Sequence, residues 1–223
     1  MFEIFDQEIL AIIWLTMRMT FSSTTISAIM GVPFGLWLAR AEFPGKKLVI
    51  SINRTLMGTP PVVVGLVVFL LFMRNGPFGA LQLLFSLEAM IIAQVILIAP
   101  IIAGIVYTAA ARNEERIRSF AYTMGATKLQ TQALLIKELG NEIFFAVVTG
   151  FGRAMSEVGA IAIVGGNIRS LTRTMTTTIA LDINRGLRNQ AVILGVVLML
   201  IAFIVQLTAD FLRKREQRAD ENF

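Results

Sequence analysis

The sequence predicts an all-α, polytopic membrane protein with five transmembrane helices. Hydrophobic residues make up 56% of the 223-residue chain and charged residues only 16%, a balance too apolar for an ordinary soluble domain. The apolar residues gather in stretches of about 20, the length at which a helix crosses the hydrocarbon core of a bilayer. Basic residues stand at the ends of these stretches rather than in one patch, which argues against a nucleic-acid partner.

The residue types and motifs that the chain lacks exclude several kinds of chemistry. The chain contains no Cys and no His, which excludes disulfides, thiolate chemistry, His metal ligands and His proton relays. It has no G-x-x-x-x-G-K-[ST] motif, so it does not bind ATP through a P-loop. Because Ser–His pairs and carboxylate dyads are missing as well, we predict that the chain is not an enzyme and holds no metal or cofactor.

The first predicted span covers residues 19–39. Residues 9–17 are apolar but too few to cross a bilayer, and Arg18 separates them from the 21 uncharged residues that follow. We therefore assign residues 1–15 to an extracytoplasmic or interfacial segment. The span is rich in Ser and Thr and contains Gly31 and Gly35, which suits packing against other helices inside a bundle.

Four further spans follow. They are the apolar stretches 55–73, 89–111, 143–164 and 189–209. A short basic loop, residues 40–54, precedes the second span, which Gly58, Pro60 and Pro61 interrupt. Since adjacent prolines remove two backbone donors, the freed carbonyl groups need partners in the bundle or in a wet cavity.

The distribution of Lys and Arg predicts the orientation. With the charged tail, residues 210–223, in the cytoplasm, the inner segments carry thirteen basic residues and the outer segments five. The inner residues are Arg40, Lys46, Lys47, Arg54, Arg112, Arg116, Arg118, Lys128, Lys137, Arg213, Lys214, Arg215 and Arg218, and the outer ones are Arg74, Arg169, Arg173, Arg185 and Arg188. The N-terminus is then outside and the C-terminus cytoplasmic.

The polar segment 113–140, between the third and fourth spans, predicts two short helices around a glycine. Asn113 can cap the first helix. Its predicted apolar face is Ile117, Phe120, Ala121 and Met124. Both helices are too short to span a bilayer. The segment is a docking surface or an ordinary helical loop.

The junction between these two helices has its own signals. Gly125 stands where the residue after a helix turns left-handed. Thr127 and Gln130 have the spacing of a capping box, which starts a second helix at once, and Gly140 can end it.

Two charges interrupt the fourth span. Arg153 and Glu157 are four residues apart, so on a continuous helix they share a face and can pair. Around them Gly152, Ser156 and Ala160 form a ridge of small residues where another helix can approach. Because charge inside a span is costly, the pair is either an element of a pathway or gate, or a buried ion pair that fixes a helix contact.

The outer stretch 165–188 combines arginines with hydroxyl groups. Arg169 and Arg173 stand among Ser and Thr residues, and guanidinium and hydroxyl groups are those that hold tetrahedral oxyanions. The alternative is a solvated, β-branched segment at the membrane interface.

Several stretches together resemble the type I ABC importer permeases. In that family the cytoplasmic coupling loop reads E-A-A-x-x-x-G. Here Gly125 and Ala121 match, whereas Ser119 and Phe120 stand where Glu and the first Ala are usual, and Lys137 and Glu138 replace a Leu-Pro. The stretches ARAEFPGKK, PPVVVG and RNGPFG are similar to parts of molybdate-type permeases.

The later stretches are more specific. GFGRAMSEVGA, residues 150–160, and GGNIRSLTRTMTTTIAL, residues 165–181, are similar to the permease subunit of tungstate importers. Molybdate and sulfate permeases carry related versions. The resemblance covers roughly residues 16–209, which it identifies as the transmembrane domain of such a permease.

The resemblance implies an oxyanion importer, most simply for tungstate, in a bacterial or archaeal plasma membrane. It implies a homodimer of this chain, a separate ATPase subunit that holds ATP and Mg²⁺, and a periplasmic or lipid-anchored binding protein. The implied ATPase-coupling residues are Ser119, Phe120, Ala121, Met124, Gly125, Ala126 and Leu129. The pathway or gate candidates are Pro60, Pro61, Arg153, Glu157, Asn167, Arg169, Arg173, Thr176, Thr177 and Thr178.

Three alternatives stay open. The first is a permease of the same kind for molybdate or sulfate. The second is an ion-gradient-driven secondary transporter, although such folds usually carry repeats, more spans and intramembrane acids. The third is a membrane scaffold without transport.

Overall fold

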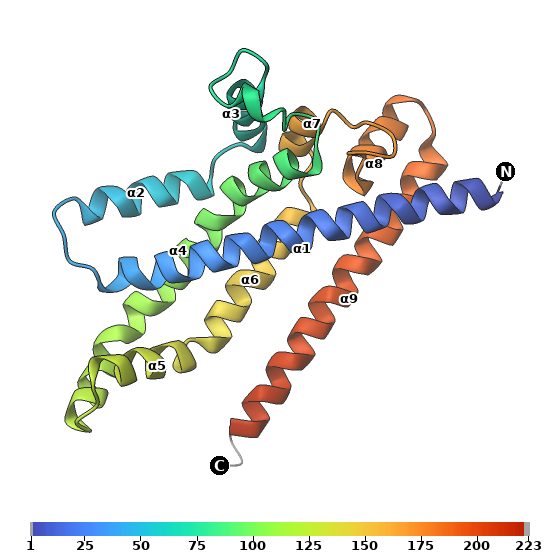
Figure 1. The fold of residues 1–223 in the computed structure, drawn as a ribbon. Coiled ribbons are helices and arrows are strands. Elements are labelled where there is room, and N and C mark those ends of the chain that lie inside the picture. The colour runs from blue at the N-terminus through green and yellow to red at the C-terminus, as the bar shows by residue number, and fades with distance from the viewer. Residues whose placement is uncertain (1, 221–223) are drawn as a thin grey trace. The chain divides into compact units, whose positions relative to one another are not determined.

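A computed structural model describes residues 2–220 of the protein; the side chains of residues 2–6, 114–115, 128–129, 132, 210 and 212–220 lie outside this description. All regular secondary structure in the described range is helical, as predicted. Its elements are α1 (Phe2–Arg40), α2 (Lys46–Met57), α3 (Pro61–Phe72), a 3₁₀ turn η1 (Gly79–Leu81), α4 (Leu87–Thr123), α5 (Lys128–Glu138), α6 (Gly140–Met155), α7 (Gly159–Gly165), α8 (Met175–Asn184) and α9 (Arg188–Asp220) (Figure 1).

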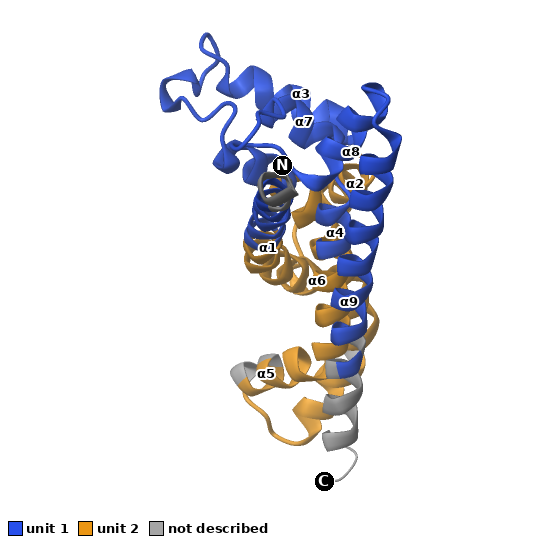
Figure 2. Cartoon of the chain, turned by 90° about the vertical axis from the view of Figure 1, so that its right-hand side faces the viewer, with its two compact units in different colours: residues 1–23, 60–94, 151–223 blue, residues 24–59, 95–150 orange. Residues whose placement is uncertain are grey.

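The chain divides into two compact units (Figure 2). Unit 1 consists of residues 1–23, 60–94 and 151–223, and unit 2 of residues 24–59 and 95–150. The long helices α1, α4 and α6 contribute residues to both units.

Unit 2 is built on a close approach of α1 and α4. A Cβ atom on Gly31 would lie 2.9 Å from the carbonyl oxygen of Ala99, and one on Gly35 would lie 2.6 Å from that of Ala103. Only glycine allows the two backbones to meet so closely, which confirms that the Gly31 and Gly35 face of α1 packs against another helix. In the same unit Asn53 of α2 donates a hydrogen bond of 3.1 Å to the carbonyl oxygen of Pro100 in α4.

Two hydrophobic clusters lie among the described residues of unit 1. One is centred on Ile12, Met175 and Leu194, from α1, α8 and α9, and the other on Met19, Met90 and Ile161, from α1, α4 and α7. Helix α3 packs on α7, where a Cβ atom on Gly65 would lie 2.8 Å from the Cα atom of Ala160. The small residues at this contact let the two backbones approach.

Three helices in the described range are long and apolar enough to cross a membrane: Gln7–Arg40, Leu87–Asn113 and Arg188–Ala209. Two further pairs, α2 with α3 and α6 with α7, pass the same test only as pairs that bend at a short break. The helices therefore allow three to five spans, and five is the number obtained if each bent pair crosses once.

Three predicted boundaries differ from those of the helices. Residues 40–54 were expected to form a loop, but residues 46–57 form α2, because no Gly or Pro interrupts this stretch after the turn at Gly45. The first predicted span begins at residue 19, whereas α1 runs unbroken from Phe2 and through Arg18, since a single charge does not break a helix. Likewise α9 continues into the predicted tail as far as Asp220.

Candidate functional site

The segment predicted to dock with a partner begins as an extension of α4. Asn113 was predicted to cap a helix, but it lies inside α4. Its side-chain Nδ2 donates to the carbonyl oxygen of Ala109 at 3.1 Å. The prediction failed because the residues after Ala109 are mostly good helix formers, without Gly or Pro before Gly125. The first short helix is therefore the end of a 37-residue helix.

The end of α4 is a Schellman motif centred on Gly125. Gly125 has φ 70°, as expected for a left-handed residue after a helix. The Ala126 amide donates to the Ala121 carbonyl oxygen at 2.9 Å, and the Gly125 amide donates to that of Tyr122 at 3.0 Å. These two bonds satisfy carbonyl groups that the helix end would otherwise leave free.

Helix α5 starts with the predicted capping box. The Gln130 amide donates to the Thr127 hydroxyl at 3.3 Å, and the Thr127 amide donates to Gln130 Oε1 at 2.8 Å. Gly140 does not end α5, contrary to the prediction; α5 ends at Glu138 with Leu139 as its C-cap, and Gly140 begins α6. Leu139 closes the helix at φ −89°, a value that any residue adopts, so no glycine is needed there.

The predicted apolar face of this segment is split between core and surface. Ile117 and Ala121 are buried, whereas Phe120 and Met124 are 60% and 73% exposed. Tyr122 adds to the exposed group at 84%. Ser119 is also exposed and Ala126 half-buried, and the side chain of Leu129 lies outside the described residues. The outward apolar side chains leave an unpartnered surface beside Gly125.

A second candidate lies where the fourth predicted span breaks. Helix α6 ends at Met155 and α7 begins at Gly159, so residues 156–158 are not helical. Arg153 and Glu157 still form the predicted pair, with Arg153 Nη1 3.1 Å from Glu157 Oε2. They do not share a helix face, however, because Glu157 lies in the break. For the same reason Gly152, Ser156 and Ala160 form no ridge, and this prediction was wrong.

Side chains satisfy the free backbone groups of the break. Glu157 Oε1 accepts from the Ala160 amide at 3.0 Å, and Thr176 Oγ1 donates to the Glu157 carbonyl oxygen at 2.8 Å. On the other side Gln94 Nε2 donates to the carbonyl oxygen of Ala154 at 2.8 Å. A break inside a membrane requires such partners, since lipid offers none.

Gln94 is a residue that the sequence analysis missed. It is fully buried, and its Oε1 accepts a 2.7 Å hydrogen bond from the Ser23 hydroxyl, so it links α1 to the end of α6. The available signal was a single amide within the otherwise apolar stretch 89–111, since a polar side chain inside a span is usually there for a contact.

The two prolines define the start of α3 rather than an interruption of one helix. Pro60 is the N-cap and Pro61 the first residue of α3, the position at which a missing amide costs least. Helix α3 then meets α7 beside the break, where a Cβ atom on Gly159 would lie 2.9 Å from Val62 Cγ2. The prolines and Glu157 thus belong to neighbouring ends of two packed helices.

The third candidate is the outer stretch 165–188, which the structure ties to α1. Arg169 Nε donates to Glu8 Oε1 at 2.8 Å, and Arg169 Nη2 bonds the other carboxylate oxygen of Glu8. This hydrogen bond raises the pKa of Arg169 above its ordinary value. Arg173 Nη1 lies 3.9 Å from the same carboxylate, and its Nη2 donates to the carbonyl oxygen of Asn167 at 3.4 Å.

The threonines of this stretch have separate roles. Thr177 completes a capping box with Thr174 at the start of α8, and Thr178 donates to the Thr174 carbonyl oxygen at 2.6 Å. Thr176 belongs instead to the break through Glu157. Glu8 could not be recognised from the sequence pattern, because its partner Arg169 is 161 residues away in the chain.

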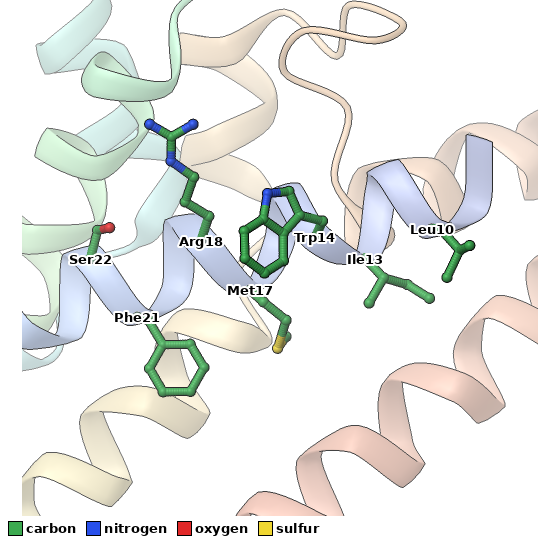
Figure 3. A pocket seen from close by; sticks show the side chains of 7 residues that line it. All are labelled: Leu10, Ile13, Trp14, Met17, Arg18, Phe21 and Ser22. Carbon is green, nitrogen blue, oxygen red and sulfur yellow. The ribbon is translucent and has the colours of Figure 1, made fainter. Parts of the chain in front are cut away.

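The exposed side of α1 forms an apolar hollow of about 670 Å³ in unit 1. It is lined by Leu10, Ile13, Trp14, Met17, Arg18, Phe21 and Ser22. In Figure 3 Met17 and Phe21 extend from one side of the helix and Arg18 from the opposite side. Trp14 is 71% exposed, so this side of the helix needs a cover of lipid or protein.

The combination of several membrane-length helices, a capped helix junction and a broken span is typical of transport permeases. The chain belongs to the family of binding-protein-dependent transport system inner membrane components, whose model matches residues 31–218. It is therefore a multi-pass inner-membrane permease and not an enzyme. Permeases of this family hold no cofactor, and ATP is bound by their partner ATPase.

Two relatives share most of their length with this chain. The tungstate uptake system permease protein TupB of Peptoclostridium acidaminophilum is 41% identical over 201 residues, which cover 90% of this chain and 88% of the relative. The probable anion ABC transporter permease protein of Haloferax volcanii is 35% identical over 100% of this chain and 98% of the relative. The resemblance seen in the sequence is thus confirmed at the level of the family.

More distant similarities extend the comparison. The sulfate transport system permease protein CysW of Escherichia coli is 25% identical over 97% of this chain and 78% of the relative. A chain of the MetNI methionine ABC transporter, solved in inward facing conformations, is 20% identical with a TM-score of 0.71, covering 96% of this chain and 99% of that one. At this identity the structural match concerns the fold alone.

Proposed function

We propose that this protein is the pore-forming permease subunit of an ATP-driven importer whose cargo is tungstate. The observation that carries the proposal is the 41% identity to a tungstate uptake permease over nearly the whole chain. The similarity to CysW makes sulfate the second candidate. Both ions are tetrahedral oxyanions, which guanidinium and hydroxyl groups recognise.

In this proposal the segment 113–140 is the coupling loop, on the cytoplasmic side. Its exposed Phe120, Tyr122 and Met124 insert into a groove of the ATPase, as apolar side chains of a helix do in helix-in-groove recognition. Gly125 fixes the angle between α4 and α5, and the neighbouring Ser119, Ala121, Ala126 and Leu129 complete the loop. Closure of the ATPase then drives the permease between inward-open and outward-open packings.

The functional unit of the proposal is a homodimer with its N-termini outside and its C-termini in the cytoplasm. Residues 16–209 form the transporter domain, residues 1–15 an outer segment and residues 210–223 a cytoplasmic tail. The apolar hollow on α1, with its exposed Trp14 and Phe21, is suited to a second copy. A periplasmic or lipid-anchored binding protein delivers the oxyanion to the outer mouth.

The pathway runs past the two candidate regions of unit 1. The outer residues Asn167, Arg169 and Arg173 receive the anion, together with the Thr176–Thr178 hydroxyl groups. The break with Arg153 and Glu157, beside the start of α3 at Pro60 and Pro61, is the bending point that opens or closes the route. A break held by side chains can rearrange by exchanging hydrogen bonds, whereas a continuous helix cannot.

Uptake of labelled tungstate by cells with and without this chain tests the proposal, with molybdate and sulfate as competitors. Deletion should abolish high-affinity tungstate uptake, and sulfate should compete weakly. If deletion instead abolished sulfate or molybdate uptake, the proposed mechanism would stand, but the cargo would be that ion. Uptake that persists without the co-expressed ATPase would contradict an ATP-driven importer.

A further inference from the structure

In unit 1, two arginines hold the Glu8 carboxylate in the way that they would hold a free oxyanion. Its carboxylate receives two hydrogen bonds from Arg169, one of them 2.8 Å long, and lies 3.9 Å from a nitrogen of Arg173. A carboxylate and a tetrahedral oxyanion offer a guanidinium the same pair of acceptor oxygens. The two arginines therefore form a site with anion-binding geometry, which Glu8 occupies from within the chain.

Arg173 is poorly satisfied by this arrangement. Its side chain is only 15% exposed, yet among the described residues its buried Nε has no hydrogen-bond partner. Its one side-chain hydrogen bond within the described part of the chain is the 3.4 Å contact with the Asn167 carbonyl oxygen. A largely buried guanidinium with five donors normally has more partners than this, so Arg173 retains capacity for a further anionic acceptor.

A cavity of about 360 Å³ adjoins the pair, and we name it the arginine cavity. Its polar lining consists of Glu8, Arg169, Arg173, Thr178, Asp182, Arg185 and Gln190, and the rest is apolar. Its three arginines outnumber its two carboxylates. The space is many times the roughly 30 Å³ that a water molecule takes up in the liquid, so a small oxyanion fits beside the arginines.

We propose that the arginine cavity binds one tetrahedral oxyanion and that Glu8 is its internal competitor. The identity of the ion as tungstate rests on the proposed function; the site itself rests on Arg173, Arg169 and the cavity. When the Glu8 carboxylate leaves the guanidinium groups, the oxyanion takes its place. Since the site is open only in the fraction of molecules in which Glu8 has moved away, Glu8 weakens the apparent affinity and favours release.

The test is equilibrium dialysis of labelled tungstate against the purified complex of this chain with its ATPase, without the binding protein. Glu8→Gln removes the competing charge and should tighten binding by about tenfold. Arg173→Gln should weaken binding by about tenfold or more. Arg188→Gln makes the same charge change at an exposed residue near the cavity but outside its lining, and should leave the affinity unchanged.

Each variant is checked for assembly with the ATPase by size-exclusion chromatography, so that loss of binding is scored only in intact complexes. Equal affinities for the wild type, Glu8→Gln and Arg173→Gln would overturn the site and leave Glu8 as a structural link between α1 and the outer stretch. An Arg188→Gln complex that loses affinity as Arg173→Gln does would also overturn it, since general charge would then explain the binding. Cellular tungstate uptake is measured in parallel: its absence in the wild type contradicts the proposed function, whereas the dialysis series alone decides the site.

Discussion

The junction at Gly125 and the break at residues 156–158 are both places where one helix ends and another begins, but they are held together differently. At Gly125 the Schellman motif and the capping box use only residues 121–130. At the break the partners come from elsewhere: Gln94 is 60 residues from Ala154, and Thr176 is 19 residues from Glu157. The first junction has exposed side chains around it, whereas Glu157 and Gln94 are buried.

This difference follows from the surroundings of each junction. A helix end in water leaves its free carbonyl and amide groups to solvent, so local capping is enough. A helix end inside a membrane bundle has no water to bind, so packed neighbours must supply each partner. Substitutions at the break should therefore act on the whole fold, and substitutions at Gly125 on one helix junction.

The largest effect is expected for Arg153→Ala. It leaves the Glu157 carboxylate, whose side chain is 4% exposed, without its countercharge, and should lower the free energy of unfolding by about 3 kcal/mol. The double variant with Glu157→Ala should recover part of this loss, because no buried charge is then stranded. Both variants are compared with the wild type by thermal unfolding of the detergent-purified transporter and by the uptake rate. If the double variant is as impaired as the single one, the loss of pairing is not the source of the effect.

Gly125→Val is expected to have the next largest effect. At φ 70° a β-branched residue is strained, with a cost of about 2 kcal/mol. The variant should remain in the membrane and hydrolyse ATP with its partner but lose coupled uptake.

Gly140→Val is the matched control. Gly140 lies in the same segment, with no atoms within 4 Å of an added Cβ and no positive φ, so this variant should transport normally. Normal transport by Gly125→Val would refute the coupling role of the junction.

The smallest effect is expected for Thr127→Ala. Loss of the side-chain cap should destabilise the first turn of α5 by about 1 kcal/mol, seen as faster hydrogen exchange of the amides of this turn. Thr131→Ala is the control, because the Thr131 hydroxyl donates to the Thr127 carbonyl oxygen and takes no part in the capping box. Equal exchange in the two variants would show that the capping box does not hold the start of α5.

The sequence predicted that Arg153 pairs with Glu157, although on a continuous helix that the structure interrupts. By itself it determined the helical membrane class, the left-handed Gly125 and the capping box of Thr127 and Gln130. Each of these depends on composition or on residues within one or two helical turns, where backbone geometry leaves few alternatives. It also led to the prediction that the arginines of the outer stretch hold anions, but it did not indicate that Glu8 contacts them.

Only the tertiary structure decided that the fourth span breaks, that Gln94 supports the break, and that Glu8 reaches Arg169 and Arg173. It also divided the predicted apolar face of the segment 113–140, with Ile117 and Ala121 buried and Phe120 and Met124 exposed. These features depend on which helices lie against one another. In a chain whose spans are mostly apolar, hydrophobic periodicity carries little information about neighbours, because lipid and protein interior are equally suited to the same side chains.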